Sequence, residues 1–321
     1  VMTCLCCGTE IGIHASDEEK LHSWHRRCTK KFFGTTKMPK LDLNKEKFEE
    51  LANAAITQGL TVPGVQKKLS LHLSTDIDTR LTVVDYPAGY ILKPQTEEYE
   101  MLPEFEDFAM RAAKLAGIQT VPHALIKNDG QYAYITRRID RNTDESGATQ
   151  LYAMEDFCQL SERLTIDKYK ASYEKCGKIV KQYSQQPGLD LSELFLRIVF
   201  SYVIGNSDMH LKNFSLIEDA PGSRKFSLSA AYDMLPVNIV LPEDNEELAL
   251  TLNGKKRNIH RKDFLAFAQN CEISPSAAEK MTNKLCHLEN AFLAACEASY
   301  LSDELKSKTS ELISERIYRL K

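Results

Sequence analysis

The alternation of hydrophobic and polar residues divides the chain into a β-rich first part and a helical second part. Residues 61–139 hold short runs that suit strands, and a single helical stretch at residues 103–117 interrupts them. From Glu155 onward, apolar residues recur mostly at helical spacing, with short strands expected at residues 214–217 and 226–228. This order predicts an α+β fold of two lobes with a cleft between them.

Smaller features complete the expected organisation. Residues 48–56 suit a short helix, residues 141–150 a polar loop, and the tail from Ser274 two helices. The expected domains are a small Cys/His unit at residues 1–35, a mostly β N-lobe at 36–140 and a helical C-lobe at 141–321.

One polar stretch lies between two segments that both look buried. In "YVIGNSDMHLKNFSLI", residues 202–217, a core helix is expected to end at Gly205 and a strand to begin at Phe214. A plain turn would explain the Gly, Asn, Ser and Asp. The turn does not explain His210 and Asn213 at these offsets from Asp208, so the loop is a candidate for holding catalytic groups in fixed geometry.

Five polar residues in apolar surroundings form a set that suits phosphoryl transfer: Lys93, Glu106, Asp208, Asn213 and Asp233. Such chemistry uses a lysine on the nucleotide phosphates, a helix glutamate that holds it, an aspartate base, and an asparagine and a second aspartate on Mg²⁺. Asp208 and Asn213 have the five-residue spacing of the protein-kinase loop. In that loop a histidine precedes the aspartate, whereas His210 follows it here. The order therefore indicates a relative of the ordinary eukaryotic-type kinases.

Several motifs occur in one order over residues 61–273. They are "TVPGVQKKLSL", "YILKP", "PEFEDFAMRAAKLAG", "ITRRIDR", "MEDFCQL", "IGNSDMHLKNFSL", "AAYDMLP" and "LALTLNGKKRNIHRKDFLAFA". Together they resemble the HipA-type bacterial serine/threonine kinases, the toxin component of a toxin–antitoxin system. The resemblance implies a two-lobed protein-kinase-like fold and an activity that depends on ATP and Mg²⁺.

The resemblance also assigns roles by position. Asp208 would be the catalytic base, with His210 as a support residue at the catalytic centre. Lys93 would contact the ATP phosphates with Glu106 as its partner, and Asn213 and Asp233 would bind Mg²⁺.

The glycine-containing loop resembles the family's phosphate loop. The residues that would lie over the phosphates are Gly64, Val65, Gln66 and Lys68. A serine of this loop is autophosphorylated in the family, and the matching position here is Thr61, which makes autophosphorylation at Thr61 an expectation.

The first residues carry metal-ligand spacing. "CLCC" and "HSWHRRC" offer a Cys-x2-Cys pair and a His-x2-Cys pair, which suit tetrahedral Zn²⁺. The expected ligands are Cys4, Cys7, His25 and Cys28, with Cys6 and His22 as alternatives. A reduced cluster that binds no metal is the other interpretation. A unit of this size has little core, so a metal would supply its fold.

The composition of the chain excludes several classes of protein. The 321 residues are 43% hydrophobic and 27% charged, with a formal net charge of -4, which suits a globular chain rather than a whole-surface nucleic-acid binder. No apolar run is long enough for a membrane span, and the polar start does not suit a secretory signal. Nine scattered cysteines do not suit a disulfide framework and indicate the cytoplasm.

The resemblance implies several partners. The family's targets are aminoacyl-tRNA synthetases, so a translation protein is the expected substrate. An antitoxin with a helix-turn-helix DNA-binding domain is a further expected partner, and this chain itself is not expected to bind DNA. The usual N-terminal subdomain is missing from the pattern, which suggests a separate small subunit. The rival functions are a non-catalytic binding module that uses the zinc unit or ATP, and a small-molecule phosphotransferase.

Overall fold

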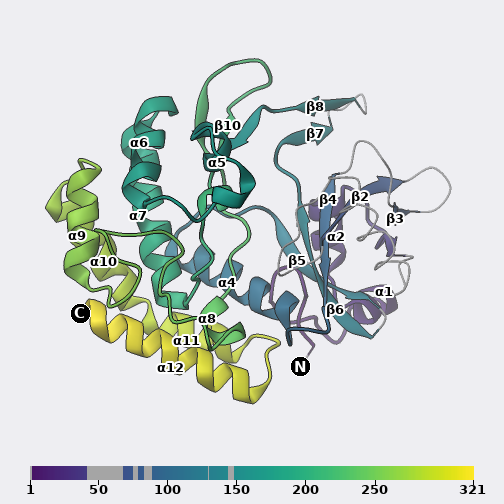
Figure 1. The fold of residues 1–321 in the computed structure, drawn as a ribbon. Coiled ribbons are helices and arrows are strands. Elements are labelled where there is room, and N and C mark those ends of the chain that lie inside the picture. Colours follow the sequence, from purple (N-terminus) through teal and green to yellow (C-terminus); the bar gives the residue numbers. More distant parts are fainter. Residues whose placement is uncertain (1, 42–67, 75–78, 83–88, 129, 144–147) are drawn as a thin grey trace. The chain divides into compact units, whose positions relative to one another are not determined.

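The computed structural model describes residues 2–41, 68–74, 79–82, 89–128, 130–143 and 148–321. The chain divides into two compact units. Unit 1 comprises Val1–Asp107 with Val121–Thr149, and unit 2 comprises Phe108–Thr120 with Gln150–Lys321. Unit 1 is built on a sheet and unit 2 is mostly helical, which confirms the predicted α+β class (Figure 1).

A six-stranded sheet forms the centre of unit 1, with the strand order β1-β3-β2-β4-β6-β5. Its strands are β1 (Lys40–Leu41), β2 (Leu69–Ser74), β3 (Arg80–Thr82), β4 (Tyr90–Pro94), β5 (His123–Asn128) and β6 (Gln131–Arg137). The β1–β3 pair is parallel and the other pairs are antiparallel. β4 lies between β2 and β6, and its register places Lys93 opposite Tyr134. A polar residue on this inner strand is therefore held by rigid neighbours on both sides.

The N-terminal residues belong to the same unit as the sheet. They form α1 (Asp17–His22) and α2 (Arg26–Phe33). The backbone N–H of Leu125, on β5, donates to the carbonyl of Leu5 at 3.2 Å, and the hydroxyl of Tyr90 donates to the carbonyl of Phe32 at 3.2 Å. The ring of Trp24 packs against Phe32 with 5.5 Å between ring centroids. This segment therefore shares its core with the sheet.

One long helix, α7 (Pro187–Ile204), forms the core of unit 2 (Figure 1). Most of its side chains are buried, and it contacts α6, α9, α10 and α12. A proline begins it and the left-handed Gly205 ends it, as helix-terminus chemistry predicts. The other helical elements of the unit are α5 (Phe157–Leu160), η1 (Thr165–Asp167), α6 (Tyr173–Tyr183), η2 (Leu211–Asn213), α8 (Val237–Val240), α9 (Arg261–Asn270), α10 (Pro275–His287), α11 (Glu289–Glu297) and α12 (Asp303–Leu320).

A small antiparallel sheet follows the loop after α7. Its order is β11-β10-β9, with β9 (Met154–Asp156), β10 (Ser215–Glu218) and β11 (Phe226–Leu228). The strands predicted at residues 214–217 and 226–228 are therefore present. The ends of the predicted polar loop pair as β7 (Arg141–Thr143) and β8 (Thr149–Leu151). The remaining helix, α4 (Leu102–Ala116), begins in unit 1 and ends in unit 2.

The tail from Ser274 was expected to form two helices, but it forms three. α10 ends at His287, with Leu288 as its C-cap. After α11, the side chain of Ser302 accepts from the backbone N–H of Leu305 and begins α12. Apolar periodicity continues across the first break, so the pattern alone does not reveal it. The helix expected at residues 48–56 lies outside the described residues. Among the described helices, none combines the length and apolar character that crossing a membrane requires.

Candidate active site

Unit 1 contains a buried ion pair. The amine of Lys93, on β4, donates to Oε1 and Oε2 of Glu106, on α4, at 2.7 and 2.9 Å. Lys93 is 6% exposed and Glu106 is 1% exposed. The amine also lies 5.6 Å from the centre of the Tyr134 ring. Burying two charges costs several kcal/mol per ion unless the pair is well made, so this geometry fixes the amine in one place.

The loop after α7 is shaped by its two ends. Gly205 has φ of +73°, and its backbone N–H donates to the carbonyls of Ser201 and Tyr202. Only glycine takes this left-handed conformation without strain. At the other end, η2 leads directly into β10. The sequence prediction of a tight loop between a core helix and a core strand is confirmed.

Asp208 lies in this loop with a defined set of neighbours. Its carboxylate accepts a hydrogen bond from the hydroxyl of Tyr169, and its backbone N–H donates to Oδ1 of Asn206 at 3.2 Å. The side chain is 38% exposed. Burial by the surrounding chain raises the pKa of Asp208 to about 6; the Tyr169 hydrogen bond opposes this rise, and the charges of Asp233 and Asp244 add to it.

The structure brings Asn213 and Asp233 to the same loop. The side-chain amide of Asn213 donates to the backbone carbonyl of Asp208 at 2.9 Å, which joins the two residues of the five-residue spacing. Asp233 is close enough for its charge to raise the pKa of Asp208. Asp233 has φ of +58°, a left-handed conformation that Asp tolerates better than most residues. Two carboxylates and an amide oxygen are ligand types that Mg²⁺ takes in proteins.

His210 is a buried neighbour of Asp208 rather than its hydrogen-bond partner. Its Nε2 lies 3.9 Å from Oδ1 of Asp208, beyond hydrogen-bond distance. Its ring meets Tyr169 edge-on, with 5.0 Å between ring centroids. Burial and the positive charge of Lys168 lower the pKa of His210 to about 4, so the ring is neutral near pH 7. This setting suits a support residue.

The predicted phosphate loop falls mostly outside the described residues. Thr61, Gly64, Val65 and Gln66 all lie there, while Lys68 is described as an exposed residue just before β2. The roles expected for this loop therefore remain predictions.

Four predicted metal ligands meet in unit 1. One ligand atom from each of Cys4, Cys7, His25 and Cys28 lies within 4.8 Å of every other. A tetrahedral zinc site with Zn–S distances of about 2.3 Å separates its ligand atoms by about 3.8 Å, so the four residues fit the metal with small adjustments. The alternatives Cys6 and His22 are outside this group.

The orientation of His25 adds to this fit. Its Nε2 lies 3.1 Å from the carbonyl of Glu10, which can only accept a hydrogen bond. The proton therefore belongs on Nε2, and Nδ1 is left with a lone pair. Nδ1 lies 3.4 Å from Sγ of Cys7 and 3.9 Å from Sγ of Cys28. Metal-ligating histidines are oriented by their second nitrogen in this way.

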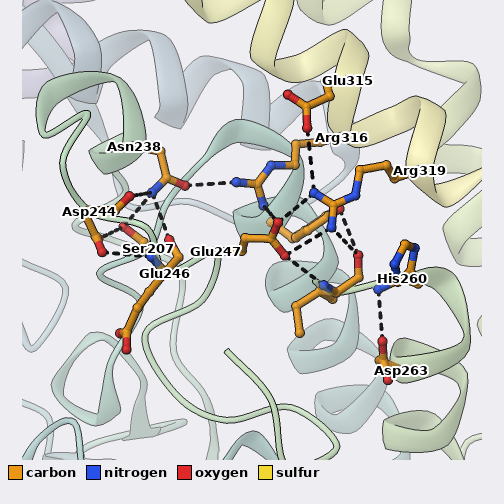
Figure 2. Close-up of polar contacts among 12 residues, drawn as sticks. Ser207, Asn238, Asp244, Glu246, Glu247, His260, Asp263, Glu315, Arg316 and Arg319 are labelled. Atoms are coloured by element: carbon orange, nitrogen blue, oxygen red, sulfur yellow. Dashed lines mark hydrogen bonds and ion pairs between the residues drawn. The ribbon is translucent and has the colours of Figure 1, made fainter. Parts of the chain in front are cut away.

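A polar network supports the residue before Asp208. The hydroxyl of Ser207 donates to Oδ2 of Asp244 at 2.6 Å. The side-chain amide of Asn238 donates to Oγ of Ser207 at 3.3 Å and to the carbonyl of Glu246 at 2.9 Å. Figure 2 shows these groups pointing toward one another. The residue on the N-terminal side of Asp208 is therefore held by side chains from residues 238 and 244.

The same network extends to α12. Nη2 of Arg316 donates to Oδ1 of Asn238 at 3.3 Å, and Nη1 of Arg319 donates to Oε1 of Glu247 at 2.6 Å (Figure 2). Sequence reasoning missed this network and also missed Tyr169. Tyr169 and the partners of Ser207 lie far from Asp208 in the sequence and belong to no local motif, so no signal in the sequence could have identified them.

Comparisons with known proteins agree on one family of sequences. The family model described as the HipA-like C-terminal domain matches residues 60–292. A putative kinase of Haemophilus influenzae is 29% identical over 247 residues, which are 68% of this chain and 68% of that protein. Two putative kinases of Sinorhizobium fredii are 28% and 30% identical, over 70% and 67% of this chain. The chain spans about half, 54%, of the length of those two proteins.

Solved structures show the same type of fold. HipA of Shewanella oneidensis, from a toxin–antitoxin complex with HipB and operator DNA, matches with a TM-score of 0.69 over 85% of this chain and 71% of that chain. The Helicobacter pylori proinflammatory kinase CtkA matches with a TM-score of 0.53 over 78% of this chain and 93% of that chain. The identities are 17% and 13%, so the likeness concerns the fold, which is kinase-like.

Proposed function

Because the chain belongs to the HipA-like C-terminal domain family, as its motifs predicted, we propose that it is an ATP- and Mg²⁺-dependent serine/threonine protein kinase. The observation that carries the proposal is the cluster of Asp208, Asn213 and Asp233 in unit 2, with the amide of Asn213 bound to the backbone of Asp208. The buried Lys93–Glu106 pair in unit 1 supports it, because kinases use such a pair on the nucleotide phosphates.

Each residue has a role in the proposed reaction. Asp208 accepts the proton of the acceptor hydroxyl while the acceptor oxygen bonds to the γ-phosphorus of ATP. The bond between that phosphorus and the β–γ bridging oxygen breaks, and ADP leaves with the electron pair. Lys93 neutralises phosphate charge and Glu106 holds its amine. Magnesium, held by Asn213 and Asp233, would neutralise charge on the phosphates.

The glycine-containing loop would contribute regulation. We propose that Gly64, Val65, Gln66 and Lys68 contact the nucleotide phosphates, since backbone N–H groups in such loops bind phosphate oxygens. We also propose Thr61 as an autophosphorylation site. A phosphopeptide that contains Thr61, found after incubation with Mg·ATP and lost in Asp208→Ala, would support the second point.

The Cys/His cluster is proposed to bind structural zinc through Cys4, Cys7, His25 and Cys28. The mutual distances of the four ligand atoms and the orientation of His25 support this assignment. Bound zinc would fix the N-terminal segment, which has a small core of its own. The metal would have no part in phosphoryl transfer.

The partners are proposed by family. The likeness to a HipA structure solved with HipB and DNA supports a DNA-binding antitoxin as a partner of this chain. An aminoacyl-tRNA synthetase is the proposed protein substrate, and a small protein that resembles the missing N-terminal subdomain is a further proposed partner. None of the nine cysteines is paired in a disulfide, which is consistent with the proposed cytoplasmic site of action.

The test compares phosphoryl transfer by the parent, Asp208→Ala and the control Glu243→Ala, whose side chain is exposed. γ-Labelled ATP, Mg²⁺ and a degenerate serine/threonine peptide mixture are the reagents. We expect labelled serine or threonine with the parent and the control only, and nucleotide affinity within a few-fold in Asp208→Ala. Equal and negligible transfer by all three proteins would favour the binding module. Label on small molecules alone would favour the small-molecule phosphotransferase.

A further inference from the structure

Tyr169 lies in a segment that is attached to the loop of Asp208. The segment connects α5 to α6. The backbone N–H of Leu211 donates to the carbonyl of Lys168 at 3.3 Å, and the hydroxyl of Tyr173 donates to the carbonyl of Met209 at 3.0 Å. These two hydrogen bonds lie on either side of Tyr169, so the tyrosine and the loop are held in one register.

Backbone hydrogen bonds to Thr251 also fix this segment. The backbone N–H of Tyr173 donates to the carbonyl of Thr251 at 2.9 Å, and the N–H of Thr251 donates to the carbonyl of Ala171 at 3.4 Å. The backbone on the C-terminal side of Tyr169 is therefore tied to Thr251 by two hydrogen bonds. Side chains whose supports are fixed in this way keep a single orientation.

The side chain of Tyr169 meets charged or polar groups at three places. Its hydroxyl donates to Oδ1 of Asp208. Its ring meets His210 edge-on at an interplanar angle of 81°. The amine of Lys168 lies 5.0 Å from the ring centre. Burial and the neighbouring charge of Asp208 raise the pKa of the Tyr169 hydroxyl, so it remains a hydrogen-bond donor at physiological pH.

We propose that Tyr169 is a positioning residue, whose hydroxyl holds Oδ1 of Asp208 so that Oδ2 faces the acceptor hydroxyl. A carboxylate turns easily about the bond to its Cβ, and a single fixed donor removes that freedom. A base must present its oxygen within hydrogen-bond reach of the proton that it takes. The inference rests on the proposed kinase function.

Among the described residues, no other neighbour donates a hydrogen bond to this carboxylate. The charge of Lys168 lowers the pKa of Asp208, but its amine lies over the ring of Tyr169. Asn213 donates to the backbone carbonyl and not to the carboxylate. Nε2 of His210 is too distant at 3.9 Å. Asp233 and Asp244 carry carboxylates, which accept hydrogen bonds when ionised and repel a third carboxylate. The phenol of Tyr169 is therefore the donor in the described part of the chain that orients this side chain.

The test removes only the hydroxyl. Tyr169→Phe keeps the ring against His210, and Tyr183→Phe is the matched control, because Tyr183 lies half-exposed at the end of α6. The full chain is assayed with Mg·ATP and the degenerate serine/threonine peptide mixture, and kcat, the KM for ATP and the unfolding midpoint are measured. We expect Tyr169→Phe to lower kcat about 10- to 100-fold with KM within about two-fold. Tyr183→Phe is expected to match the parent.

The alternative outcomes separate the two hypotheses. A parent protein without phosphoryl transfer overturns the proposed function, and the inference with it. An active parent with unchanged kcat in Tyr169→Phe overturns the inference alone. A higher kcat in Tyr169→Phe would make the tyrosine a blocker of Asp208 and would also overturn it. A fall in kcat together with a large fall in the unfolding midpoint would make its role structural and overturn it as well.

Discussion

The indole N–H of Trp24 donates a hydrogen bond to the backbone carbonyl of Leu125 at 3.0 Å, and both residues are buried. Leu125 lies on β5, the last strand in the order of the unit 1 sheet. An uncovered strand edge presents unpaired backbone groups that favour association with other chains. The N-terminal segment therefore covers part of this edge with its one tryptophan.

Replacing that tryptophan should destabilise unit 1. Trp24→Phe removes the donor, leaves the Leu125 carbonyl buried without this partner and opens a cavity, so we expect a loss of about 2–4 kcal/mol in the free energy of unfolding. Urea unfolding measures it. Tyr318→Phe, at a side chain that is 80% exposed, is the control and should change the free energy little. A loss below about 0.5 kcal/mol in Trp24→Phe would show that the edge does not need this contact.

Zinc content should distinguish the ligands from a neighbouring cysteine. We expect Cys4→Ser to lose bound zinc, because a ligand is removed, and Cys6→Ser to retain it, because Cys6 lies outside the group of four. Elemental analysis of protein purified without chelator measures the metal. A parent content below about 0.2 zinc per chain would reject a structural site. Retention in Cys4→Ser with loss in Cys6→Ser would show a different ligand set.

The Lys93–Glu106 pair should affect stability and nucleotide binding separately. Glu106→Gln leaves a buried amine without its counter-charge, so we expect a loss of about 3–5 kcal/mol in unfolding free energy and weaker Mg·ATP binding. The double variant Lys93→Met with Glu106→Leu should regain stability, because neither position then buries a charge. It should not regain nucleotide binding, because the amine is absent. Glu98→Gln, at an exposed residue, is the control. Strong Mg·ATP binding by the double variant would refute the role of Lys93.

Asp140 should make the free energy of unfolding of unit 1 depend on pH in the acid range. Its carboxylate accepts hydrogen bonds from Arg138 and Arg141, with shortest distances of 2.7 and 2.9 Å. Burial acts to raise the pKa of Asp140, but the two guanidinium groups outweigh it and lower the pKa to about 2, from an ordinary value of 3.8. The folded state therefore binds this proton less readily than the unfolded state, which stabilises the fold above pH 3.8 by about 2 kcal/mol.

This stabilisation should disappear as the pH falls from 3.8 through 2. Unfolding free energies at pH 7 and near pH 2 are compared for the parent and Asp140→Asn. We expect the variant to be less stable at pH 7 and the difference to shrink near pH 2, where about half of the parent carboxyl is protonated in the folded state. A difference that does not depend on pH would contradict the ion-pair explanation.

The parts of the fold that follow from local chemistry were predictable from the sequence. The helix that ends at Gly205, the strand after Phe214 and the meeting of Cys4 with Cys28 all depend on short-range spacing or on ligand type. The candidate centre was predictable too, because Asp208 and Asn213 lie five residues apart and their contact is local. The break at Leu288 was not, because the apolar period runs through it.

Contacts that join distant segments could not be predicted in the same way. Tyr169 reaches Asp208 across 39 positions, and Arg316 reaches Asn238 across 78. Nothing in the neighbouring residues of Tyr169 or Asn238 specifies these partners. They follow from how the helices of unit 2 pack, which depends on the summed burial of many side chains rather than on a motif.

The link from α12 to Ser207 has a consequence during protein synthesis. Arg316 is made more than a hundred residues after Asp208, yet it bonds to Asn238, which in turn bonds to the neighbour of Asp208. A nascent chain that has not yet released this helix from the ribosome therefore lacks one anchor of its candidate catalytic loop. Chains that terminate before this helix would keep a less rigid loop around Asp208.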